Sequence, residues 1–87
     1  MGIIGDFNGW GGDVVMTWNP TDFCYEATDP GVTANGWKFR INADWAINLG
    51  GSLTELVNGG DNLSAVGTTI KLYPTRKTSD KIYCTVE

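Results

Sequence analysis

The sequence contains no histidine, and this absence removes the commonest metal ligand and the usual general base near neutral pH. A Ser-His-Asp or Cys-His catalytic site is therefore excluded. Cysteine is scarce as well, because Cys24 and Cys84, sixty residues apart, are the only two in the chain. This spacing excludes a zinc site built from closely spaced cysteine pairs. The two residues either form a single cross-strand disulfide or remain unpaired thiols, and the sequence leaves both possibilities open.

Basic residues and long apolar segments are also few. Six Lys and Arg residues stand against ten acidic residues, which gives a net charge of −4 at pH 7. Because the six are dispersed along the chain, the basic patch that binds a phosphate backbone is missing, and we expect no nucleic-acid partner. No apolar run approaches the roughly 20 residues that cross a bilayer, so we expect no direct membrane insertion by this module.

The length of the chain indicates its domain organisation. Eighty-seven residues are enough for a single modest core, so residues 1–87 are predicted to form one domain. The strand-like segment IIGDF almost directly follows Met1, and this fits a module excised from a longer, multi-module protein.

Glycine and proline divide the rest of the sequence into short segments rich in β-branched and aromatic residues, which is typical of an all-β sandwich. We expect an immunoglobulin-like β-sandwich of about seven strands, at 2–7, 13–18, 23–28, 36–42, 46–49, 67–73 and 81–86. Turn-rich segments are predicted at 8–12, 19–22, 29–35, 50–62 and 74–80. The one candidate for a helical turn is Ser52–Leu56, where Ser52 and Glu55 have the spacing of a capping box.

The strand predicted at 36–42 separates apolar from polar side chains, because successive residues of a strand point to opposite faces. The apolar face contains Trp37, Phe39 and Ile41. The polar face contains Lys38, Arg40 and Asn42. We expect the first face to pack in the core and the second to present two cations and an amide.

A hydrolase without histidine would need a pair of carboxylates. The acidic residues in or beside predicted loops are Asp6, Asp13, Asp44, Glu55 and Asp61. A chain this small cannot easily build the deep cleft that raises the pKa of one member of such a pair. Loop aspartates more often form turns, and no twelve-residue calcium loop is present. We therefore predict no enzymatic activity, no cofactor and no metal site.

Tryptophan is abundant, with four residues in 87. Trp18 and Trp37 occupy strand positions and are predicted to pack in the core. Trp10 and Trp45 follow the polar turns FNG and NAD, where the chain should lie at the surface. They either fold back to cap one end of the sandwich or form a carbohydrate platform, because an indole stacks on the apolar face of a sugar ring. The neighbouring side chains that can hydrogen-bond sugar hydroxyls are Lys38, Arg40, Asn42, Asn48 and Asn62.

Four segments, IGDFNGW, MTW, WKFRINADWAINLGG and GGDNL, resemble a known family. Over about residues 3–73 the chain is similar to starch-binding modules of the SusE/SusF type from Bacteroidetes outer-membrane lipoproteins, which are related in motif to glycogen- and starch-binding sandwich modules. In those glycogen-binding relatives the glucan site consists of residues that correspond to Trp10, Lys38, Trp45 and Asn62. The Sus-type pattern adds Arg40.

The resemblance implies an immunoglobulin-like sandwich that binds α-1,4-glucan, either starch or maltooligosaccharides, without cleaving it. It further implies a soluble module at the cell surface, attached to the outer membrane through its parent lipoprotein. Its partners would be the α-glucan and other proteins of a glycan-uptake complex. The alternative is a structural or protein-interaction domain without a sugar ligand, whose aromatic residues pack against a neighbouring domain.

Overall fold

The computed structural model describes residues 1–74 and 81–87, and antiparallel strands dominate this part of the chain. The strands are β1 (Gly2–Gly5), β2 (Val14–Val15), β3 (Thr17–Asn19), β4 (Cys24–Thr28), β5 (Trp37–Ile41), β6 (Asp44–Ser52), β7 (Glu55–Asn58), β8 (Thr69–Tyr73) and β9 (Tyr83–Val86). One 3₁₀ turn, η1 (Asp6–Asn8), follows β1, and no α-helix occurs in the described ranges. The predicted all-β fold class is confirmed.

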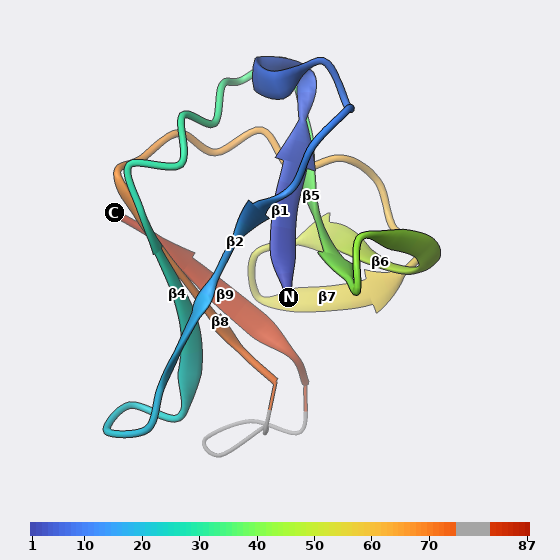
Figure 1. Ribbon diagram of the computed structural model, residues 1–87. Helices are drawn as coiled ribbons and strands as arrows, with labels where there is room; N and C mark the ends of the chain where they lie inside the picture. The colour runs from blue at the N-terminus through green and yellow to red at the C-terminus, as the bar shows by residue number, and fades with distance from the viewer. Residues whose placement is uncertain (75–80) are drawn as a thin grey trace.

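The strands form two antiparallel sheets that pack as a sandwich (Figure 1). The five-stranded sheet has the order β2-β1-β5-β6-β7, and the four-stranded sheet has the order β3-β4-β8-β9. Strand β5 is central in the first sheet. Its side chains therefore alternate between the core of the sandwich and the outer surface of the sheet.

The backbone joins the two sheets at both edges of the sandwich. At one edge the chain passes from β2 in the first sheet to β3 in the second through the single residue Met16. At the other edge the Leu56 N–H donates to the Ile82 carbonyl over 2.8 Å, and the Cys84 N–H donates to the Leu53 carbonyl over 2.8 Å. These bonds satisfy strand-edge groups that would otherwise be open to pairing with another chain.

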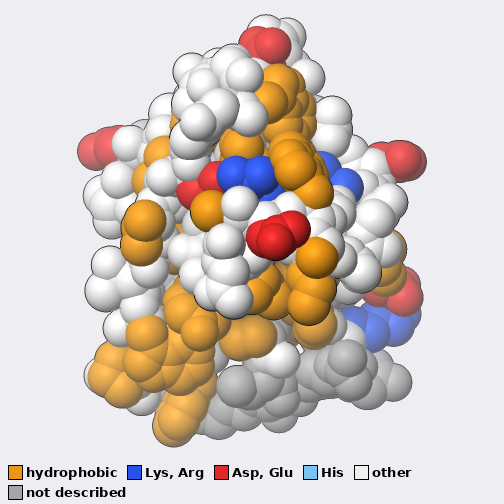
Figure 2. Space-filling view, turned by 45° about the vertical axis from the view of Figure 1, so that its right-hand side comes forward, with side chains coloured by type: hydrophobic (Ala, Val, Ile, Leu, Met, Phe, Trp, Pro, Cys, Tyr) orange, Lys and Arg blue, Asp and Glu red, His pale blue; other side chains and the backbone are white. Residues whose placement is uncertain are grey.

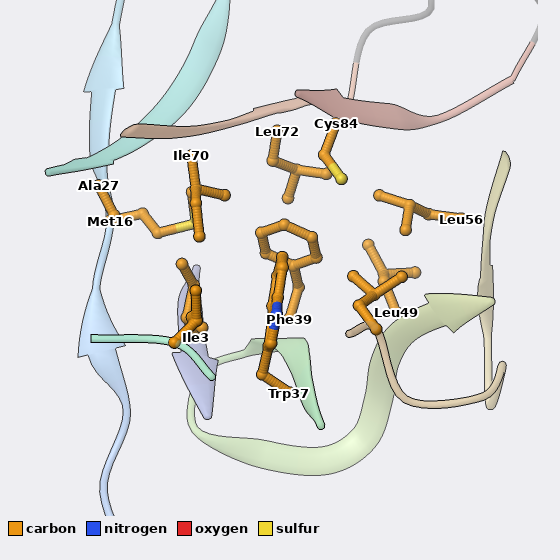
Figure 3. Close-up of a cluster of buried hydrophobic side chains, with 12 residues drawn as sticks. Ile3, Met16, Ala27, Trp37, Phe39, Leu49, Leu56, Ile70, Leu72 and Cys84 are labelled. Carbon is orange, nitrogen blue, oxygen red and sulfur yellow. The ribbon is translucent and has the colours of Figure 1, made fainter. Parts of the chain in front are cut away.

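The core lies between the two sheets and is centred on Trp37 and Phe39 of β5, both fully buried (Figure 3). Their rings meet edge to face with centroids 5.3 Å apart. The Trp37 indole N–H donates to the Ala65 carbonyl over 2.9 Å, so its polar atom is satisfied inside the core. Side chains from both sheets surround the two rings, among them Ile3, Leu49, Ile70, Leu72 and Cys84. Truncating either ring to alanine would cost about 3–5 kcal/mol.

The strand map corrects the sequence prediction in three places. The described residues contain nine strands rather than about seven, partly because the strand predicted at 13–18 is divided into β2 and β3 as it changes sheet. The segment predicted as a turn-rich region at 50–62 contains the end of β6 and all of β7. Ser52 pairs with Glu55 across the resulting hairpin, so the predicted helical turn there is wrong. The turn predicted at 74–80 lies, after Pro74, outside the described residues.

The two tryptophans predicted to be in the core differ in environment. Trp37 is fully buried, as predicted, whereas Trp18 is 40% exposed. Trp18 contacts Phe23 and Tyr25 edge-on, with ring centroids 6.5 Å and 5.0 Å apart. Trp18 lies on β3, the edge strand of the four-stranded sheet, so a neighbouring strand covers it on one side only.

Cys24 and Cys84 are both buried, free thiols. Strand β8 lies between β4 and β9, which contain them, and only Cys84 belongs to the core cluster. Of the two alternatives that the sequence left open, the structure therefore has the unpaired thiols. Burial raises the pKa of Cys84 to about 12, so this thiol is protonated and a poor nucleophile near neutral pH.

Candidate functional site

Lys38 and Arg40 lie on the outer face of β5, yet each residue is only 8% exposed. Their neighbours Trp37 and Phe39 point to the opposite face, into the core. Ile4 pairs with Lys38 across β1 and β5 and is fully buried without belonging to the core cluster. The outer face is therefore covered at this point. Figure 2 shows a small group of Lys and Arg atoms near the centre of the view, bordered by hydrophobic and acidic side chains.

Trp10 lies in a tight loop that follows η1. The Asn8 amide holds the loop, because its Oδ1 accepts a hydrogen bond from the Gly5 N–H over 3.1 Å and its Nδ2 donates to the Gly12 carbonyl. The Trp10 N–H donates to the Gly5 carbonyl over 2.9 Å. Trp10 has a φ of 58° and the preceding Gly9 a φ of 66°. For a bulky residue this left-handed backbone conformation costs about 1–2 kcal/mol, and the hydrogen bonds of the loop hold Trp10 in it.

Trp45 lies on a bulge of β6, beside the turn that joins β5 to β6. The turn consists of Asn42 and Ala43, whose φ values of 56° and 52° are typical of a type I′ hairpin turn. The register then shifts, which leaves residues 45–47 without a partner on β5. Bulges redirect side chains, and Trp45 is 47% exposed in this position.

The loop after η1 and the bulge of β6 bring Trp10 and Trp45 into contact, although the residues are 35 positions apart in the sequence. Their ring centroids are 6.0 Å apart and their planes differ by 38°. This distance is within the range of favourable aromatic pairs. The contact creates an apolar surface made of two tilted indoles at the edge of the outer face.

Arg40 lies directly against Trp45. Its guanidinium carbon is 4.7 Å from the centroid of the indole, which is a cation–π contact. The same guanidinium binds both carboxylate oxygens of Asp13: Nε donates to Oδ2 over 3.0 Å, and Nη2 donates to Oδ1. The hydrogen bond to Asp13 raises the pKa of Arg40 further above its ordinary value. Arg40 is therefore engaged on two sides by groups of this chain.

Lys38 extends along the same face toward β6. A Cβ on Gly50 would clash with the Asp61 carbonyl oxygen and lie 2.9 Å from Lys38 Cε, so the glycine makes room for both the neighbouring backbone and the lysine stem. The Lys38 ammonium donates hydrogen bonds to Asn48 Oδ1 and to the Gly60 carbonyl. It makes no ion pair with any carboxylate of the described residues. An ammonium has three donors, so one N–H of Lys38 has no acceptor in this part of the chain.

The two asparagines of the predicted site have different roles. Asn48 accepts from Lys38 and donates through Nδ2 to the Trp45 carbonyl over 2.9 Å, so it links the lysine to the bulge. Asn62 is exposed and lies against Gly36, where a Cβ would be 3.0 Å from its Nδ2. Asn62 immediately precedes Leu63, which pairs with Trp37 at the start of β5. Its amide makes no side-chain hydrogen bond within the described residues.

The structure thus joins five of the predicted site residues in one chain of contacts: Trp10, Trp45, Arg40, Asn48 and Lys38. Within the described residues, no hydrogen bond, ion pair or ring contact joins the Asn62 side chain to these five. Asn42, which the strand alternation also placed on this face, instead forms the hairpin turn. Sequence reasoning missed Asp13 as the partner of Arg40, and the only signal for it was its position in the loop after Trp10.

No group of three acidic or cysteine side chains that could bind a metal ion occurs in residues 1–74 and 81–87. The same ranges contain no helix that is long and apolar enough to cross a membrane. Comparisons of the chain with protein-family models, curated proteins and solved structures find no match.

Proposed function

We propose that this chain is a non-catalytic binding module for α-1,4-glucan, either starch or maltooligosaccharides. The observation that supports this most strongly is the contact between Trp10 and Trp45, with ring planes 38° apart. Each indole can stack on the apolar face of one glucose unit. Two tilted rings suit the curved surface of an α-glucan better than the flat ribbon of a β-linked glucan.

Polar groups beside the indoles support a sugar ligand. Lys38 retains one N–H donor that no described residue accepts, and the exposed amide of Asn62 can both donate and accept. Sugar hydroxyls need such fixed partners at the rim of an apolar surface. Lys38 is fixed by its bonds to Asn48 and Gly60, so little side-chain entropy is lost when it donates to a hydroxyl.

The carboxylate at this site does not favour catalysis. Asp13 is held in a bidentate ion pair with Arg40, and its side chain is 8% exposed. Both oxygens of this carboxylate are bound by the guanidinium, so neither is free to exchange a proton with a bound sugar. We therefore assign the site to binding alone.

The resemblance to SusE/SusF-type modules implies where in the cell this function would operate. The proposal is that an immunoglobulin-like module in a surface lipoprotein captures glucan at the outer membrane and supports its uptake with other proteins of the complex. A shallow, exposed site implies an affinity on the order of micromolar to millimolar per module, which several modules in one protein would strengthen.

The first prediction concerns the two indoles. We expect Trp10→Ala and Trp45→Ala each to weaken maltoheptaose binding at least about tenfold, the effect of removing an aromatic residue at the centre of a binding surface. Titration calorimetry or amide NMR shifts measure the affinity. Trp18→Ala is the matched control for Trp45→Ala, because Trp18 is similarly exposed but lies in the other sheet, and its loss should leave the affinity unchanged.

The thermal transition of each variant separates binding from folding. Because Trp10 and Trp45 lie outside the core cluster, both variants should remain folded, with small changes in Tm. A wild-type protein that shows no response to several millimolar maltoheptaose would contradict the proposal. In that case a structural or protein-interaction domain, tested by a shift of tryptophan fluorescence with a neighbouring domain, becomes the better assignment.

A further inference from the structure

We propose that Asp13 and Arg40 are positioning residues that fix the orientation of the Trp45 indole, and with it the angle between the two rings. The consequence of this inference for sugar binding rests on the proposed function. Its structural part, the orientation of Trp45, can be tested without any sugar.

The bulge alone does not determine where the Trp45 ring points. Residues 45–47 have no partner on β5, so no pair of strand hydrogen bonds fixes the backbone there on that side. The Asn48 amide holds the Trp45 carbonyl, but this bond leaves the side-chain torsions of Trp45 free. The ring makes an aromatic contact with the Trp10 indole and a cation–π contact with the Arg40 guanidinium.

Asp13 makes the guanidinium a rigid support. Two hydrogen bonds to one carboxylate fix both the position and the plane of the arginine fork. The pair is largely removed from solvent, with side-chain exposures of 10% for Arg40 and 8% for Asp13. An ion pair in such a place is stronger and less mobile than one at the surface. The indole therefore rests on a plane that cannot easily rotate.

The sheet provides the space that this arrangement needs. Gly2 of β1 pairs with Arg40 of β5, and a Cβ on Gly2 would be 2.9 Å from the Cβ of Asp13. The glycine allows the carboxylate to lie beside the arginine on the outer face. Asp13, which directly precedes β2, Arg40 of β5, Trp45 and the half-buried Trp10 thus form a continuous series of contacts.

The first experiment measures the orientation of the rings by circular dichroism. Two indoles at this distance couple and produce an exciton couplet in the far ultraviolet, which Trp10→Ala and Trp45→Ala should abolish. We expect Asp13→Asn and Arg40→Lys to weaken the couplet, because the first removes the carboxylate charge and the second removes the planar fork. Asp22→Asn is the matched control, since Asp22 pairs with Lys71 in the other sheet.

The second experiment measures the affinity for maltoheptaose in the same variants. We expect Asp13→Asn and Arg40→Lys to weaken binding by about fivefold to tenfold, since a disordered Trp45 must be ordered again when sugar binds. In a Trp45→Ala background the same substitutions should have no further effect on affinity. A merely structural role for the pair would lower Tm but would not show this dependence on Trp45.

The possible outcomes are distinct. If folded Asp13→Asn and Arg40→Lys proteins keep both the couplet and the wild-type affinity, the positioning role is overturned. If Asp13→Asn does not fold, Arg40→Lys decides the question, since it retains the charge that pairs with Asp13. If the wild type does not bind maltoheptaose but the couplet weakens in both variants, the proposed function fails while the positioning of Trp45 by Asp13 and Arg40 is supported.

Discussion

Lys38 and Arg40 are equally buried, but their charges are stabilised in different ways. Arg40 has a carboxylate partner in Asp13, whereas Lys38 has two neutral acceptors and no ion pair within the described residues. Burying a charge without an opposite charge is unfavourable, and natural proteins tolerate such costs mainly where function needs them. Under the proposed function, this contrast assigns Lys38 to contact with the sugar and Arg40 to the support of Trp45.

Replacing Lys38 by methionine tests this contrast. Lys38→Met keeps the length of the stem and removes the charge, so we expect the free energy of unfolding to change by less than about 1 kcal/mol. Maltoheptaose affinity should fall about tenfold or more, because a hydrogen-bond donor to the sugar is lost. Urea unfolding and titration calorimetry measure the two quantities.

Arg40→Met is the comparison variant. It leaves Asp13 buried without a partner, so it should lower the free energy of unfolding by about 3–5 kcal/mol. Equal destabilisation by the two methionine substitutions would show that Lys38 also has a structural role of similar weight.

Among the structural elements, the hairpin of β5 and β6 contributes most to the site. It supplies Lys38 and Arg40 from one strand and Trp45 and Asn48 from the other. Its turn places Ala43 at a φ of 52°, a conformation that is unfavourable for residues with a Cβ. The turn is therefore a place where stability can be gained without touching the binding surface.

We expect Ala43→Gly to stabilise the protein by about 0.5–1 kcal/mol, because Asn-Gly is the favoured sequence for this turn and glycine removes the steric strain. The midpoint of thermal unfolding should rise by roughly 3–6 °C. Ala46→Gly is the matched control: Ala46 has no positive φ, so the same substitution should destabilise slightly. A lower Tm for Ala43→Gly would contradict the turn assignment.

The hairpin also shows which features could be predicted from the sequence. The faces of β5 were predicted correctly for residues 37–40, because alternation is a local property of a strand. Ile41, which was expected in the core, is only half-buried and lies outside the core cluster, beside the hairpin turn. The bulge and the partner of Arg40 could not be predicted, because they depend on strand register and on a contact between residues 27 positions apart. β7 was missed because glycines at 50, 51, 59 and 60 resemble loop sequence, whereas Gly50 is needed for the close approach of the Asp61 and Gly60 carbonyls.

For the whole molecule, the distribution of charge limits the ligands that the site can hold. The chain has a net charge of −4, and Asp13 neutralises Arg40, so Lys38 is left as the only described cation of the site without an ion pair. A single cation on an acidic protein favours an uncharged ligand over a polyanion, because the overall field repels negative groups. This agrees with the proposed neutral glucan.

The dependence of binding on salt tests this conclusion. A neutral glucan displaces no counterions, so we expect the maltoheptaose affinity to change by less than about twofold between about 50 mM and about 500 mM NaCl. Titration calorimetry at several salt concentrations measures it, with Lys38→Met as a variant that should be equally insensitive to salt. Heparin, a polyanionic sugar, should not compete with maltoheptaose. A steep loss of affinity with salt in the wild type, absent in Lys38→Met, would instead indicate a ligand that Lys38 recognises by charge.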